Sequence, residues 1–148
     1  MKTIFVVLLA IAFFLSGVVN VLKQIGISKA LDEIIRFINL VKTEVHYTTA
    51  DFENIYLKGK AQDYKYISFS ENLIFLNKSV GKIIVDDFNG FINKIGTTDD
   101  VGQLNICDEY KERFEDILNK RKVKEKEKLQ VNTALSLFGA LTVLIFFL

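Results

Sequence analysis

The last 29 residues, 120–148, read KRKVKEKEKLQVNTALSLFGALTVLIFFL. Eight of the nine residues from Lys120 to Lys128 are charged, and six of them are basic. The twenty residues that follow, Leu129 to Leu148, carry no charge. A helix needs about 20 apolar residues to span a bilayer. The stretch therefore predicts a transmembrane helix preceded by a lysine cluster. A buried core helix is the alternative, but so uniform an apolar run does not favour it.

The other end of the chain repeats this pattern. The segment TIFVVLLAIAFFLSGVVNVL, residues 3–22, is another twenty residues without a charge. A cleaved signal peptide is the alternative, but SGVVNV is a poor cleavage site and the apolar run continues past it. We expect an uncleaved transmembrane helix over 1–22, a domain over 23–130 and a second transmembrane helix over 131–148.

Basic residues predict the orientation, because positive charge near membrane ends stays on the cytoplasmic side. Lys23 and Lys29 follow the first span, and the lysine cluster precedes the second. The middle domain should therefore be cytoplasmic. Outside it the chain holds one basic residue, Lys2, so the domain has 18 basic and 18 acidic residues and no net charge. This balance does not point to nucleic acid as a partner. The single cysteine fits a reducing compartment.

Helical spacing of apolar residues predicts an all-α bundle for the domain. Five helical segments are expected: Ser28–Tyr47, 48–59 (TTADFENIYLKG), 66–77 (YISFSENLIFLN), 82–96 (KIIVDDFNGFINKIG) and one long helix from Asp99 to Leu148. A strand is the alternative for KIIV at 82–85. The expected buried residues are Leu31, Ile34, Ile35, Ile38, Val41, Val45, Phe69, Leu73, Leu76, Ile84, Phe88, Phe91, Ile92, Ile95, Val101, Leu104, Cys107, Phe114, Ile117 and Leu118.

Capping residues mark the expected helix ends. Side-chain oxygens that can accept from free N–H groups precede three of the helices, at Ser28, at Thr48 or Thr49, and at Thr97 or Thr98. Gly59 and Gly96 are the expected stops.

Little in the sequence indicates catalysis. His46 is the one histidine, so no multi-histidine metal site is available. Cys107 lies on an apolar stripe, which favours an inert packed thiol over a nucleophile. The pairs Asp86–Asp87 and Asp99–Asp100 are explained as solvated helix faces and dipole partners. There is no glycine-rich phosphate loop. We therefore expect no enzyme activity, no cofactor and no bound metal.

Two features suggest contacts in or at the membrane. Small residues fall on one side of each membrane segment, which permits close helix packing: Ala12, Ser16, Gly17, Ser136, Gly139 and Ala140. Ordinary transmembrane composition is the equal alternative. The run NKRKVKEKEK, residues 119–128, could attract anionic lipid headgroups. A solvated helix in which Glu125 and Glu127 offset neighbouring lysines explains it more simply.

Three segments, taken in order, resemble a known family. FINLVKTEVHYTTADF, residues 37–52, is similar to a Leu-x-x-Glu-Ile-x-Tyr segment that leads into a Thr-started helix, and IGTTDDVGQ, residues 95–103, to a Leu-Gly-x-x-Asp-x-x-x-Gln turn. LSLFGALTVLIFFL, residues 135–148, matches the closing segment. This order resembles the stage III sporulation protein AB family, whose domain is similar to that of type II secretion F proteins. The chain departs from the family at residues 23–28, KQIGIS, where Arg-Pro is usual.

The resemblance implies a function that the residues alone do not. A family member is a non-enzymatic membrane platform in a channel complex between mother cell and forespore during endospore formation. It would sit in the outer forespore membrane, with its domain on the mother-cell side. The implied partners are other channel membrane proteins and a cytoplasmic secretion-type ATPase, and a homo-oligomer stays open.

Two carboxylates are the candidate partner surface: Glu44, matched residue by residue, and Asp51, at an expected helix start. Both could equally be intrahelical or capping groups. The alternative functions are a membrane-bound enzyme or transporter subunit, and a stand-alone lipid-surface protein.

Overall fold

The computed structural model describes residues 2–47, 52–71 and 73–147. It describes side chains for 25–47, 52–71, 73–128, 130, 131, 134, 135 and 138. The chain divides into two compact units: residues 1–25 with 120–148, and residues 26–119. In the first unit the described backbone is helical throughout. The second unit is the folded domain.

Helix α1 (Lys2–Tyr47) is uninterrupted, and its second part forms one wall of the domain. The expected stripe is confirmed for five residues, which are buried: Leu31, Ile34, Ile38, Val41 and Val45. Ile35 is partly buried. Ser28 is not an N-cap, because the helix begins at Lys2 and runs straight through it. Ala30 and Phe37, both fully buried, widen the stripe beyond the expected set.

Helix α2 (Phe52–Lys60) occupies the second expected segment. Gly59 is not the residue that ends it, since the helix continues to Lys60. This position needs a glycine for close packing, because a Cβ here would lie 2.6 Å from Cε1 of Phe69. The expected caps Thr48 and Thr49 lie outside the described residues.

The third expected helix is wrong, because residues 66–77 form a β-hairpin. Strands β1 (Ile67–Ser70) and β2 (Leu73–Leu76) pair antiparallel, with Ile67 opposite Leu76 and Ser70 opposite Leu73. Apolar residues that alternate with serines bury one face of a strand, and this period of two overrides the helical spacing. Leu73 therefore points outward and is 63% exposed, against expectation. The fold is mostly helical with a small two-stranded sheet, rather than all-α.

After a short 3₁₀ turn, η1 (Lys78–Val80), helix α3 (Lys82–Lys94) occupies the fourth segment. The strand alternative for KIIV is wrong. Ile84, Phe88 and Phe91 are buried as expected, and Ile92 and Ile95 are partly buried. Gly96 follows the helix at φ 82°, the left-handed conformation expected of a glycine stop.

Helix α4 (Asp100–Phe147) confirms the long closing helix. Its cap is Asp99 rather than a threonine, because the Asp99 carboxylate accepts from the Gly102 N–H at 3.0 Å. The buried side is confirmed at Cys107, Phe114 and Leu118 and includes Tyr110, which was not expected. Leu104 and Ile117 are partly buried. Val101 is 66% exposed, so its predicted burial is wrong.

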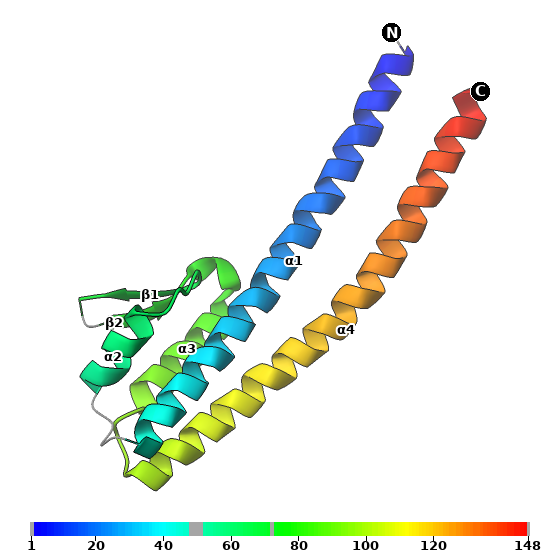
Figure 1. Ribbon diagram of the computed structural model, residues 1–148. Coiled ribbons are helices and arrows are strands. Elements are labelled where there is room, and N and C mark those ends of the chain that lie inside the picture. Colours follow the sequence, from blue (N-terminus) through cyan, green and yellow to red (C-terminus); the bar gives the residue numbers. More distant parts are fainter. Residues whose placement is uncertain (1, 48–51, 72, 148) are drawn as a thin grey trace. The chain divides into compact units, whose positions relative to one another are not determined.

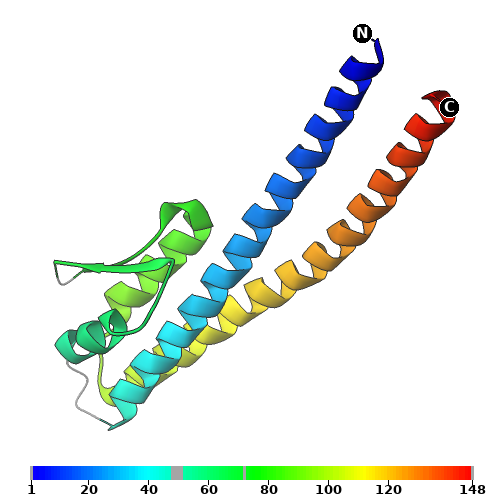
Figure 2. The ribbon, with the colours of Figure 1, turned by 45° about the horizontal axis from the view of Figure 1, so that its top comes forward.

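The core of the domain is built around Phe37. Its ring centroid lies 6.1 Å from that of Tyr64, 6.0 Å from Phe69, 5.9 Å from Phe88 and 6.5 Å from Phe91. Within the domain, residues 26–119, Figures 1 and 2 show α1, α3 and α4 side by side, with α2 and the hairpin on the side away from α4. Aromatic rings from α1, the hairpin and α3 thus meet at one point, which fixes how these elements pack.

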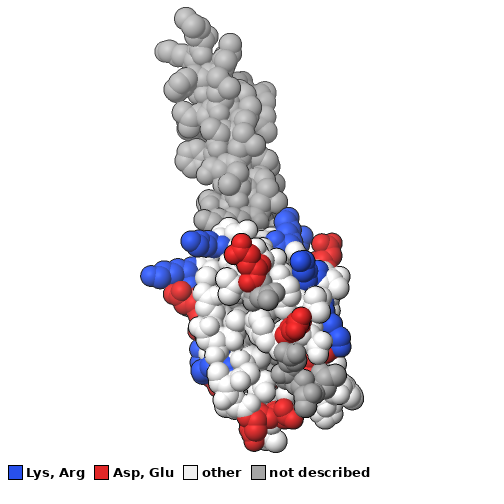
Figure 3. All heavy atoms as spheres, turned by 90° about the vertical axis from the view of Figure 1, so that its left-hand side faces the viewer, with Lys and Arg blue, Asp and Glu red and all other residues white. Residues whose placement is uncertain are grey.

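The face that carries α2 and the hairpin has no single sign of charge. Figure 3 shows acidic and basic side chains interspersed with uncharged ones over it. This agrees with the balanced charge of the middle of the chain.

Candidate functional site

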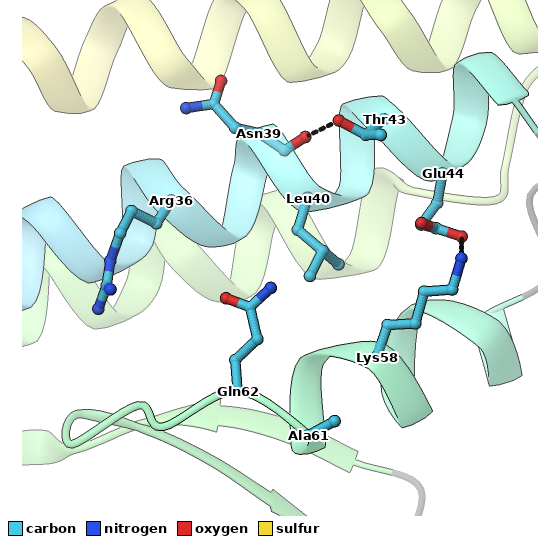
Figure 4. A pocket seen from close by; sticks show the side chains of 8 residues that line it. All are labelled: Arg36, Asn39, Leu40, Thr43, Glu44, Lys58, Ala61 and Gln62. Carbon is cyan, nitrogen blue, oxygen red and sulfur yellow. Dashed lines mark hydrogen bonds and ion pairs between the residues drawn. The ribbon is translucent and has the colours of Figure 1, made fainter.

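A groove of about 510 Å³ runs between α1 and α2 and is the candidate site (Figure 4). Its walls come from α1, from α2 and from the loop that follows α2. The lining residues are Arg36, Asn39, Leu40, Thr43, Glu44, Lys58, Ala61 and Gln62. Figure 4 shows Arg36 near one end, Glu44 facing Lys58 at the other, and Gln62 extending toward Leu40 between them.

The spacing along α1 explains the lining. Arg36, Leu40 and Thr43 recur at steps of four and three, so they share one face of the helix. The Thr43 hydroxyl donates to the Asn39 carbonyl at 2.8 Å. The groove thus combines apolar surface with hydroxyl and amide groups.

Glu44 and Lys58 close one end of the groove. The Lys58 Nζ donates to Glu44 Oε2 at 2.6 Å, and the side chains are 55% and 9% exposed for Lys58 and Glu44 respectively. The sequence offers Glu44 as a candidate partner-surface residue, but the ion pair with Lys58 holds it between α1 and α2, where little of it is exposed. Its contact with a partner stays a prediction. Asp51 lies outside the described residues.

Buried Glu33 anchors the loop that forms the other wall. Its carboxylate accepts from the backbone N–H groups of Lys65, at 3.1 Å, and Tyr66, at 2.8 Å. A carboxylate that accepts two backbone hydrogen bonds is a strong tether. Glu33 thereby holds the segment that begins with Ala61 and Gln62 against α1. Ala30 and Phe37, one helical turn to either side of Glu33 and both fully buried, are the signal in the sequence from which its burial could have been predicted.

Tyr64 lies next to the groove, with the Arg36 guanidinium 5.5 Å from its ring centroid. Burial raises the pKa of the Tyr64 phenol, the Arg36 charge lowers this pKa, and the Glu33 charge raises it. Among the described residues the Tyr64 hydroxyl is the buried side-chain atom without a hydrogen-bond partner. The guanidinium is thus held at the groove by an aromatic face as well as by its own helix.

The other candidate residues lie apart from this groove. Cys107 is fully buried in the core, as predicted, and burial raises the pKa of its thiol to about 11. His46 is exposed and stacks edge-on against Tyr47. Asp87 accepts from Arg113 at 3.1 Å. No three His, Cys, Asp or Glu residues gather in a metal-binding group within the part of the chain that was described.

The expected membrane segments can be followed in their backbone only. Ala12, Ser16, Gly17, Ser136, Gly139 and Ala140 lie outside the residues whose side chains are described. Across the described residues, no helix offers a stretch with the length and apolarity needed to cross a membrane.

Comparison with known proteins adds no relative. No family model, no curated protein and no solved structure matches the chain.

Proposed function

We propose that this protein is a non-enzymatic, membrane-anchored scaffold that presents its helical domain to a cytoplasmic partner. The main support for this proposal is that α1 and α4 are each a single uninterrupted helix that joins the domain to an uncharged end. Residues 3–22 of α1 and 129–147 of α4 contain no charged side chain, which suits them to hydrocarbon. Helical backbone also satisfies its own hydrogen bonds there.

The specific role comes from the resemblance to the stage III sporulation protein AB family. We propose that the scaffold belongs to a secretion-like channel complex made during endospore formation, in the outer forespore membrane. Its partners are a cytoplasmic secretion-type ATPase on the mother-cell side and other small membrane proteins of the channel. The groove between α1 and α2 is the proposed ATPase contact, because the segment that carries the resemblance lines it with Asn39, Leu40 and Thr43 as well as Glu44.

Affinity purification tests this function. A tagged full-length protein, solubilised in mild detergent from sporulating cells, should copurify the ATPase and the channel proteins. The membrane fraction should retain the protein through high-salt and alkaline washes, whereas a lipid-surface protein would be released. Recovery of neither the ATPase nor channel proteins would refute the scaffold role.

Groove variants test the contact surface. Arg36→Glu and Gln62→Arg change exposed lining residues and should lower ATPase recovery several-fold. Lys82→Glu, which makes the same charge change as Arg36→Glu at an exposed position on α3, is the control and should leave recovery unchanged. Circular dichroism would verify folding of each variant. Equal recovery from all three variants and the parent would remove the groove from the proposal.

A further inference from the structure

We propose that residues 120–128 of α4, here called the basic collar, bind anionic phospholipid headgroups. This rests on the proposed membrane anchoring and adds a lipid partner to it.

The collar is helical, and several of its basic side chains are exposed. It lies within α4, and Lys124, Lys126 and Lys128 are all exposed. Successive residues of an α-helix turn by about 100°, so these lysines and the basic residues at 120–122 point in several directions around the axis. Six basic and two acidic residues leave the collar strongly positive. A charge of this kind suits contact with headgroups that surround a helix, rather than with a flat surface on one side.

The rise of the helix places the lysines at headgroup depth. The uncharged segment begins at Leu129. At about 1.5 Å per residue, Lys124, Lys126 and Lys128 lie within roughly 8 Å of it along the axis. The headgroup layer on each side of a bilayer is about 5–8 Å thick, so these three lysines fall within it. The basic residues at 120–122 lie within about two Debye lengths of the start of the uncharged segment.

Charge along α4 reverses where the collar begins. Between Asp99 and Asn119 the chain has seven acidic and two basic residues, and from Lys120 to Lys128 it has six basic and two acidic. Of these acidic residues, Asp108, Glu109, Glu112 and Asp116 are exposed. A merely solvated helix requires no such separation of sign. An anionic surface attracts the collar, whereas the acidic residues of the preceding segment lie farther along α4 from the uncharged end, where salt screens their repulsion.

Lipid selectivity in reconstituted vesicles tests the proposal. The full-length protein is placed in phosphatidylcholine vesicles with a trace of spin-labelled phosphatidylglycerol or phosphatidylcholine in both leaflets. The motionally restricted fraction of each label gives the relative association constant. We expect several-fold selectivity for phosphatidylglycerol that disappears in 1 M salt. The variant K124Q/K126Q/K128Q should reduce this selectivity to near one, since each neutralised lysine weakens attraction up to roughly fivefold.

The control removes the same charge elsewhere. K78Q/K82Q/K94Q replaces three exposed lysines of the domain and should keep the selectivity of the parent. An equal loss in both triple variants would attribute the effect to net charge and overturn the proposal. Selectivity near one in the parent would overturn it too, leaving an acidic protein segment as the collar's partner. Because both leaflets carry the label, a reversed orientation does not alter the readout.

Alkaline extraction of the same vesicles tests anchoring separately. A protein that stays inserted but shows no lipid selectivity would refute lipid binding by the collar and leave the proposed membrane anchoring intact.

Discussion

Cys107 illustrates how burial changes the chemistry of one side chain. It is fully buried, and burial, then the Asp108 charge, raise the pKa of its thiol from 9.0 to about 11, against a smaller opposing effect of Lys42. The folded state therefore holds the thiol proton more tightly than the unfolded state. Stability from this difference is complete below pH 9 and is lost as the pH rises toward 11.

Cys107→Ala should reduce the free energy of unfolding by about 1 kcal/mol at pH 7, because a small buried side chain is shortened. Above about pH 9 the gap between parent and variant should shrink by up to about 1.4 kcal/mol per pH unit. Urea unfolding of the full chain in detergent, followed by circular dichroism from about pH 7 to about pH 10.5, measures both. A gap that stays constant over this range would contradict the buried, protonated thiol. ATPase copurification should persist in the variant.

At the scale of elements, the loop after α2 depends on Glu33. Glu33→Gln keeps the shape of the side chain but removes the charge and one acceptor oxygen for the Lys65 and Tyr66 N–H groups. We expect a loss of roughly 2 kcal/mol, since a charge-assisted hydrogen bond is weakened and a donor is left unsatisfied. Amide hydrogen exchange of the two residues should accelerate before that of the α4 core.

The matched control for this change is Asp63→Asn, which removes an exposed carboxylate from the same loop. Its effect on stability should stay within about 0.5 kcal/mol. Equal effects from the two substitutions would show that loop charge, rather than the tether, stabilises this wall of the groove.

Helices occupy four of the five segments predicted to be helical, and residues 66–77 are the one element predicted wrongly. The stripes of α1, α3 and α4 span several turns, so one misplaced residue such as Val101 did not hide them. Residues 66–77 are too short for that, and Phe69 and Leu76 fit a helical spacing as well as a strand. The groove could not be predicted from the sequence, because Arg36, Lys58 and Gln62 come together only through the packing of α2 on α1.

At the scale of the whole molecule, the distribution of lysines predicts which side of the membrane the domain occupies. Asn93→Cys in a Cys107→Ala background places a thiol at an exposed position of α3. In intact non-sporulating cells that express the protein in the plasma membrane, an impermeant maleimide should fail to label it and should label a cysteine added after Leu148. Labelling after permeabilisation verifies that the introduced thiol is reactive. Labelling of position 93 in intact cells would show that the domain lies on the opposite side of the membrane from the one predicted.

The order of the elements also has a consequence for how the chain is made. The core joins α1 to α4, which the ribosome makes later. Lys42 of α1 and Asp108 of α4 form an ion pair although they are 66 residues apart in the chain. Because synthesis proceeds at about 5–20 residues per second, the side of α1 that packs toward α4 stays uncovered for roughly 3–13 seconds. The elements made in that interval, α2, the hairpin and α3, bring the rings that surround Phe37. Each new chain can therefore protect its central aromatic residue before the last helix arrives.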